Sequence, residues 1–330
     1  MSTQPRHTGR CLRQLLGLLL ILSALSTLNA FYPFSYLGWT GHFQFHLLIA
    51  SILSLLLFRI PRVRAAFWRP IRVQLLFCVT GFTHFLIVAA ALAPLTQPDL
   101  VEPIPIRLGW FNAQWNPDAL DLVLGLFTDE DVDFFGIAEV PFDFHNGNPR
   151  LANWPHLAYS PSHQLLLASR TPLESTRLPR AGWPTMIKTA TTIQGRSIHL
   201  HGAHLSIPFS SNHKRQFERL PQMLAKEHKS TQAKSASLAM GDFNSTPWVQ
   251  EFADLQQSGW RDTRRGHWPT PTWGPFGHFW VGLPIDQMLI SGPLRCLNFR
   301  VGPDCLSDHK PLLVDLELGR PRREYTIGQN

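Results

Sequence analysis

Gly241-Asp242-Phe243-Asn244-Ser245-Thr246-Pro247-Trp248 is the stretch that decides the fold, and it follows an apolar run from Ala236 to Met240. Side chains two residues apart on a strand point to the same side, so Asp242 and Asn244 are expected to lie together at the strand end. The carboxylate can orient a water molecule and the amide can hydrogen-bond a developing oxyanion, as in-line attack on phosphorus requires. Both residue types are also common in turns and helix caps, so this pair alone does not establish a catalytic site.

Polar residues stand at the ends of other expected strands as well. They are Asn112, Glu139 and His204 before this stretch, and Asp286 and the triplet Ser307-Asp308-His309 after it. The order and spacing of these pieces resemble the endonuclease/exonuclease/phosphatase superfamily of DNase I-like, metal-dependent phosphoesterases. The resemblance covers residues 106–318 and is specific for fold and chemistry, whereas it says almost nothing about the substrate.

The resemblance implies a metal centre among these residues. Glu139 and Asp308 would hold a divalent metal, with Asn112 as an additional ligand or an orienting group. Carboxylate and amide oxygens suit Mg²⁺ or Mn²⁺ better than zinc. Gln114 stands where many relatives carry an acid, a departure that would weaken a second metal site.

The remaining residues receive catalytic roles from the same resemblance. Asp242 would orient or deprotonate the attacking water, and Asn244 would stabilise the pentacovalent centre. His309, steadied by Asp286, would act on the nucleophile or the phosphate, and His204 would contact the phosphate or assist the leaving group. Which group is the general base stays open.

The implied fold is α/β, a four-layer sandwich of two mixed β-sheets flanked by helices, with residues 106–204 facing residues 236–318. Apolar runs predict strands over residues 106–112, 133–140, 163–169, 186–193, 197–204, 236–240 and 310–318. Helices are expected over 117–127, capped by Asn116, over 212–227 and over 248–257. The aromatic-rich segment 260–280 contains several Pro and Gly residues and is expected to be an irregular loop, serving as a stacking or lipid-facing rim or as packing.

Charge is distributed unevenly along the 330 residues. Eight arginines and no Lys, Asp or Glu occur in residues 1–98, whereas the rest of the chain has 22 basic and 23 acidic residues. The net charge of +7 therefore reflects membrane topology and does not indicate a basic nucleic-acid-binding domain. No P-loop, dinucleotide fingerprint or Cys-x-x-Cys pair is present.

Three apolar stretches at 12–30, 43–58 and 73–95 predict an all-α membrane segment of about three transmembrane helices. Arginines precede the first stretch and fill the connection between the second and third, and positive connections stay cytoplasmic. The soluble domain is therefore expected on the non-cytoplasmic side, periplasmic or extracellular. Cleavage of residues 1–30 as a signal peptide would leave the same orientation.

The sequence thus predicts a membrane anchor (1–95), a Pro-rich linker (96–105), a catalytic domain (106–318) and a flexible tail (319–330). The expected function is hydrolysis of phosphodiester or phosphomonoester bonds in nucleic acid or in a phospholipid or inositol-phosphate head group. The alternative is a catalytically inactive module that binds a phosphorylated ligand. The bilayer is the second expected partner, and no protein partner can be deduced. Cys296 and Cys305 would pair if this domain faces an oxidising compartment.

Overall fold

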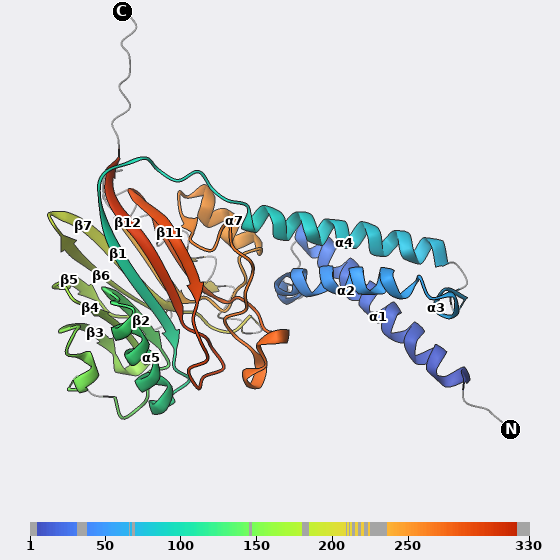
Figure 1. Ribbon diagram of the computed structural model, residues 1–330, viewed down its shortest axis with the longest axis horizontal. Helices are drawn as coiled ribbons and strands as arrows, with labels where there is room; N and C mark the ends of the chain where they lie inside the picture. The colour runs from blue at the N-terminus through green and yellow to red at the C-terminus, as the bar shows by residue number, and fades with distance from the viewer. Residues whose placement is uncertain are drawn as a thin grey trace, which may run out of the picture. The chain divides into compact units, whose positions relative to one another are not determined.

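Figure 1 shows the computed structural model of the chain. It describes residues 5–31, 38–65, 67, 70–144, 147–179, 185–208, 210, 212, 215–216, 219–220, 224 and 236–321. The chain divides into two compact units. One is a helical unit formed by residues 1–93 with 248–250, and the other is an α/β unit formed by residues 94–247 with 251–330.

The helical unit contains apolar helices over all three predicted stretches. Its elements are α1 (Pro5–Phe31), the 3-10 helix η1 (Gly38–Phe43), α2 (Gln44–Leu57), α3 (Pro61–Ala65) and α4 (Pro70–Leu92). Three segments, Cys11–Leu28, Thr40–Leu57 and Pro70–Leu92, are long and apolar enough to cross a membrane.

Buried polar side chains join the three long helices. Ser23 Oγ of α1 lies 2.7 Å from His84 Nε2 of α4, and His84 Nδ1 is hydrogen-bonded to Gln44 Oε1 of α2. Gln44 Nε2 also donates to Ser26 Oγ over 3.0 Å. In an apolar environment each of these groups needs a partner, so the network favours one arrangement of the helices over others.

The α/β unit contains two six-stranded mixed sheets, as predicted. Sheet A has the order β11-β12-β1-β2-β4-β3 and sheet B the order β5-β6-β7-β8-β10-β9. The strands of sheet A are β1 (Leu100–Asn112), β2 (Phe134–Ala138), β3 (His156–Ser160), β4 (Leu165–Ser169), β11 (Leu294–Val301) and β12 (Leu312–Pro321). Those of sheet B are β5 (Glu174–Arg177), β6 (Thr185–Ile193), β7 (Arg196–His204), β8 (Ala236–Asp242), β9 (Arg261–Asp262) and β10 (Asp286–Ser291). The pairs β1–β2 and β7–β8 are parallel, and the other paired strands are antiparallel.

Successive side chains of a strand point to opposite faces of its sheet, and this alternation separates the core clusters into layers. On β1, Leu108 and Trp110 join a core cluster that also contains Leu200 and Met240 of sheet B, so this cluster fills the space between the sheets. Phe111 points to the other face of sheet A and joins a cluster with α5 (Pro117–Asp129). Asn116 caps α5 as predicted, since its side chain accepts a hydrogen bond from the amide of Asp118 over 3.0 Å.

The expected split into facing halves 106–204 and 236–318 is wrong. Sheet A combines the beginning of the α/β unit with its last strands, and sheet B is formed by the middle. The reason is the antiparallel pairing of β12 with β1, in which Leu316 lies opposite Ile106. The final strands therefore return to sheet A instead of continuing sheet B.

Several element boundaries also differ from the sequence expectation. β1 begins at Leu100, so part of the expected linker belongs to sheet A, with a register shift between Val101 and Ile104 that accommodates Pro103. The strand expected over 163–169 begins at Leu165 after a 3-10 turn, and α7 (Gln250–Gln257) begins two residues later than expected. The helix expected over 212–227 falls largely outside the described residues, as do residues 322–330 of the expected tail.

The segment 260–280 is irregular, as predicted. Apart from β9 it contains the 3-10 turns η4 (Pro275–Gly277) and η5 (Phe279–Val281), the second ending one residue beyond the segment.

Cys296 and Cys305 are both free, which contradicts the disulfide considered from the sequence. The two cysteines belong to different layers. Cys296 packs against the cluster between the sheets, whereas Cys305 is buried in the cluster of sheet A and α5. Burial raises the pKa of the Cys296 thiol to about 12 and that of the Cys305 thiol to about 11.

Candidate active site

Strand register brings the predicted site residues to one end of both sheets. In sheet B, Asp242 at the end of β8 lies opposite His204 at the end of β7 and opposite Asp286 at the start of β10. In sheet A, Asn112 ends β1 opposite Ala138 of β2, and Glu139 follows directly. Glu139 has a φ of 50°, so the chain leaves β2 in a left-handed turn at this residue.

Asn112 connects the carboxylates of the two sheets. Its Nδ2 donates to Glu139 Oε1 and to Asp242 Oδ2, each over 3.1 Å. Its Oδ1 accepts a hydrogen bond from the amide of Gln114 over 3.0 Å, which fixes the orientation of the carboxamide. His204 Nε2 lies 3.5 Å from Glu139 Oε1 and 3.8 Å from Asp242 Oδ2.

His309 and Asp286 form a buried pair beside this group. His309 Nδ1 and Asp286 Oδ2 are 2.8 Å apart, so the carboxylate fixes the orientation of the imidazole. The indole of Trp110 donates to the other carboxylate oxygen, Asp286 Oδ1, over 2.9 Å. His309 Nε2 is directed toward two further carboxylates, 3.7 Å from Asp242 Oδ2 and 3.9 Å from Asp308 Oδ1.

Asp308 and Asn244 complete the group. Asp308 Oδ2 accepts a hydrogen bond from the indole of Trp273 over 3.0 Å, and its backbone amide donates to Gln114 Oε1 over 3.3 Å. The backbone amide of Asn244 donates to Asp242 Oδ1, and Asn244 Nδ2 donates to the carbonyl of Leu205, each over 2.8 Å. All eight predicted residues therefore belong to one connected group.

The burial of these charges has electrostatic consequences. Desolvation, together with the nearby Asp286 charge, raises the pKa of Asp242 to about 7. Burial alone would lower the pKa of His309, but Asp286 and Asp242 outweigh it and raise that pKa to about 10. Burial also lowers the pKa of His204 and raises that of Glu139. At neutral pH the site thus combines a charged His309 with a neutral His204.

Sequence reasoning missed the residues that support this group. The indole of Trp110 donates a hydrogen bond to one carboxylate oxygen of Asp286, and the indole of Trp273 donates one to Asp308. Arg264 is fully buried, and its Nη2 donates to the carbonyl of Asp286 over 3.0 Å. Trp110 has the same strand parity as Asn112, which was the available signal that it points toward the site.

The donors present fit a divalent cation. Glu139, Asp308 and Asn112 offer only oxygen and amide groups, without sulfur. In its present orientation Asn112 supports the carboxylates rather than offering its oxygen, because that oxygen accepts from Gln114. A second set, Asp242, Asp286 and His309, is buried and has potential ligand atoms within 4.8 Å of one another.

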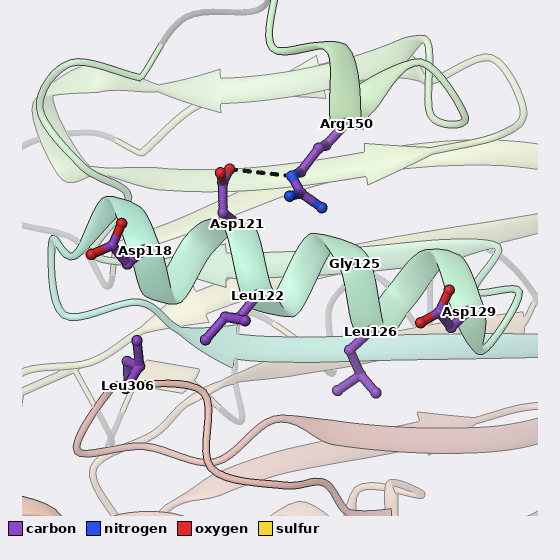
Figure 2. Close-up of a pocket in the computed structure, with 8 residues that line it drawn as sticks. All are labelled: Asp118, Asp121, Leu122, Gly125, Leu126, Asp129, Arg150 and Leu306. Atoms are coloured by element: carbon purple, nitrogen blue, oxygen red, sulfur yellow. Dashed lines mark ion pairs between the residues drawn. The ribbon is translucent and has the colours of Figure 1, made fainter.

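Figure 2 shows a surface hollow beside α5. It is lined by Asp118, Asp121 and Arg150 among others, and Arg150 Nε lies 3.6 Å from Asp121 Oδ1. None of the eight predicted site residues lines it.

Facing mixed sheets with carboxylates and histidines gathered at one end form a candidate hydrolytic site. The model of the Endonuclease/Exonuclease/phosphatase family matches residues 109–309, and the chain belongs to this family. It is therefore an enzyme of the nuclease and phosphatase type. No curated protein matches the chain.

Solved structures agree with this fold at low sequence identity. An AP endonuclease from Archaeoglobus fulgidus has a TM-score of 0.51 and 17% identity, covering 63% of this chain and 98% of its own. A 3'-5' exonuclease from Neisseria meningitidis (NExo) has a TM-score of 0.51 and 19% identity, with the same coverage of 63% and 98%. A humanized D. rerio TDP2 has a TM-score of 0.53 and 13% identity over 64% of this chain and 98% of its own.

Proposed function

We propose that the chain is a membrane-anchored, divalent-metal-dependent phosphoesterase whose catalytic domain lies on the non-cytoplasmic side. Its substrate would be a phosphate diester or monoester of nucleic acid or of a phospholipid or inositol-phosphate head group. The observation that carries the proposal is the hydrogen-bonded pair Asp286–His309, with His309 Nε2 directed toward Asp242 and Asp308.

Asp242 is the group proposed to orient or deprotonate the attacking water. Its raised pKa, about 7, matches the working range of a general base near neutral pH. The charged imidazole of His309 would stabilise negative charge that develops on the phosphoryl group. Asp286 keeps that imidazole in place by holding Nδ1, so that Nε2 faces the reacting centre.

His204 and Asn244 would complete the phosphate contacts. His204 is neutral because burial lowers its pKa, and it would hydrogen-bond the phosphate or the leaving group. Asn244 would use its amide to stabilise the pentacovalent centre. Glu139 and Asp308, supported by Asn112, would hold Mg²⁺ or Mn²⁺. When bound, such an ion would polarise a phosphoryl oxygen and offset charge in the transition state.

Anchoring is proposed from the three apolar helices and the distribution of arginines. Arg59 and Arg64 lie between the second and third segments that are long enough to span a bilayer, and Arg72 lies at the start of the third. Loops rich in arginine stay on the cytoplasmic side of a membrane, so the chain would leave the third span on the non-cytoplasmic side. In this scheme residues 1–95 anchor the protein, residues 96–99 connect it, and the α/β sheets from Leu100 to Pro321 belong to the catalytic domain.

The test is hydrolysis by the full chain, purified in detergent, of single-stranded and nicked DNA, sphingomyelin and inositol phosphates, with and without chelator. Removing metal should abolish turnover. Glu139→Gln should lose activity that excess Mg²⁺ or Mn²⁺ partly restores, because it weakens metal binding. His309→Ala should lose at least about 10²-fold in kcat without metal rescue. Asp121→Asn, which alters a carboxylate of the surface hollow, is the matched control and should be fully active.

The same assay tests the alternative, a catalytically inactive module that binds a phosphorylated ligand. A protein of that kind would bind phosphate esters without turning them over under any metal condition. Activity that persists after complete metal removal would instead contradict the proposed metal dependence while leaving the family membership intact.

A further inference from the structure

Large aromatic side chains are exposed on one loop of the α/β unit, residues 266–282, called here the aromatic loop. Trp268 is 72% exposed, Phe276 95% and Trp280 82%. Single exposed apolar residues are normal, but three large aromatics within one short segment indicate an interaction surface. Tryptophan favours places where one part of the ring is apolar and another is wet.

The base of the aromatic loop is attached to the candidate active site. Trp273 forms isolated bridges with Leu283 and with His309. The amide of Gly274 donates to the carbonyl of Asp308 over 2.9 Å, and the Trp273 indole donates to the Asp308 carboxylate. The exposed aromatics therefore project from a segment held by the site itself.

The beginning of the aromatic loop lies beside the point where the chain enters the α/β unit. A Cβ placed on Gly266 would be 3.5 Å from the ring of Pro94. Pro94 follows the end of α4 at Leu92 by two residues, a reach of at most about 7 Å. Trp268 is two residues beyond Gly266 in sequence.

The length of α4 places that point at the membrane surface if the helix crosses the bilayer. Its 23 residues span roughly 35 Å, somewhat more than the hydrocarbon core of about 30 Å. Leu92 and Pro94 would then lie at the interface, where tryptophan side chains are enriched in membrane proteins.

The charge pattern favours lipid over nucleic acid as the occupant of this surface. Residues 266–282 contain no Asp, Glu, Lys or Arg. Proteins that stack nucleic-acid bases on aromatics combine them with a positively charged groove that follows the phosphates. Beyond residue 98 this chain has 22 basic and 23 acidic residues, without such a surplus.

We infer that the aromatic loop docks into the head-group region of the bilayer and that the site acts on phosphate esters carried by membrane lipids. This inference rests on the membrane-anchored phosphoesterase proposed above. Docking would hold the segment that carries Asp308 and His309 against the lipid surface, because the base of the loop hydrogen-bonds to Asp308 and Lys310, on either side of His309. Substrate would reach the site from the bilayer rather than from solution.

Docking can be measured without any enzyme assay. In a Cys11→Ser, Cys78→Ser background, Phe276→Cys is labelled with an environment-sensitive nitrobenzoxadiazole dye. The full chain is then reconstituted in vesicles of phosphatidylcholine and phosphatidylglycerol. Leu178→Cys is the matched control, since Leu178 is exposed and follows β5 at the opposite edge of sheet B from β9. The label at 276 should shift to shorter emission wavelength and be quenched by nitroxide lipids, whereas the label at 178 should not.

The substrate is tested with the triple variant Trp268→Ser, Phe276→Ser, Trp280→Ser. Its hydrolysis of sphingomyelin or phosphoinositide in the same vesicles should fall by at least about tenfold, given the apolar area removed. Its hydrolysis of soluble bis-p-nitrophenyl phosphate should be unchanged, because the three side chains are largely exposed and none of them is one of the eight site residues. The single variant Leu178→Ser should match wild type on both substrates.

The outcomes separate this inference from the proposed function. A label at 276 that remains in water overturns docking, even if the enzyme is active. A parallel loss on single-stranded DNA, with the label in water, identifies a base-stacking surface instead. Docking without lipid turnover in an enzyme that cleaves soluble esters overturns the substrate assignment. If no ester is cleaved at all, the proposed function fails, while the label still decides whether the loop docks.

Discussion

Replacing Trp110 with Phe removes one hydrogen bond from the centre of the site while keeping an aromatic ring in the core. The indole is fully buried between the sheets, and its Nε1 donates to Asp286 Oδ1 over 2.9 Å. Asp286 keeps its bond to His309 through the other oxygen, as well as its backbone bond to Thr272. The variant therefore isolates the contribution of Trp110 to the position of Asp286.

The lost hydrogen bond determines how much Trp110→Phe should lower stability and kcat. A buried hydrogen bond to a charged group contributes about 1.5–3 kcal/mol, and its loss leaves one Asp286 oxygen without this donor. We expect the free energy of unfolding to fall by about that amount. If half of the lost energy appears in the transition state, kcat should fall by roughly three- to tenfold, with little change in KM.

Trp154→Phe is the matched control. Trp154 is also fully buried and donates its indole N–H over 2.8 Å, but to the backbone carbonyl of Val132, which is not a site residue. Urea denaturation and steady-state kinetics on both variants give the comparison. Trp154→Phe should lower stability and leave kcat unchanged. Equal effects of both substitutions on kcat, or an unchanged kcat in Trp110→Phe, would refute a positioning role for Trp110.

Further predictions concern the pair at the centre of the site, a glycine, the thiols and the topology. Asp286→Asn should lower kcat less than His309→Ala, and the double variant should be little worse than His309→Ala, whereas multiplying losses would contradict a joint role. Gly241→Ala should destabilise strongly, by more than about 2 kcal/mol, because the new Cβ would lie 2.4 Å from the carbonyl of Ala203, and thermal unfolding would measure this. The thiols of Cys296 and Cys305 should resist alkylation at pH 8 until the protein is denatured, because their raised pKa values leave little thiolate. Alkaline phosphatase fused after residue 100 should be active, and an inactive fusion would overturn the proposed orientation.

The positions of the site residues could be predicted because each depends on local sequence. Asn112, Glu139, His204 and Asp242 end or directly follow apolar strands, and the parity of a strand determines the side to which its last residue points. Because the two sheets face one another, these strand ends bring the four side chains to the same place.

The partners of these residues depend on contacts that are distant in sequence. Trp110 and Asp286 are separated by 176 positions, and nothing near either residue shows that they meet. The return of β12 to β1 is equally remote, which explains why the expected division into halves was wrong. The cysteine pairing failed for a related reason, since a shift in register between Cys296 and Asn298 and the layer occupied by Cys305 are properties of the assembled sheet.

The position of β12 between β11 and β1 in sheet A has a consequence for biosynthesis. β1 is made more than 200 residues before β12, the strand that pairs with it between Leu100 and Trp110. Asp308 and His309 immediately precede that late strand. A nascent chain interrupted just before Leu312 would have every described strand except β12, but β1 and β11 would lack the strand that joins them in sheet A. Hydrolytic activity should therefore appear in one step, after residue 321 has been made.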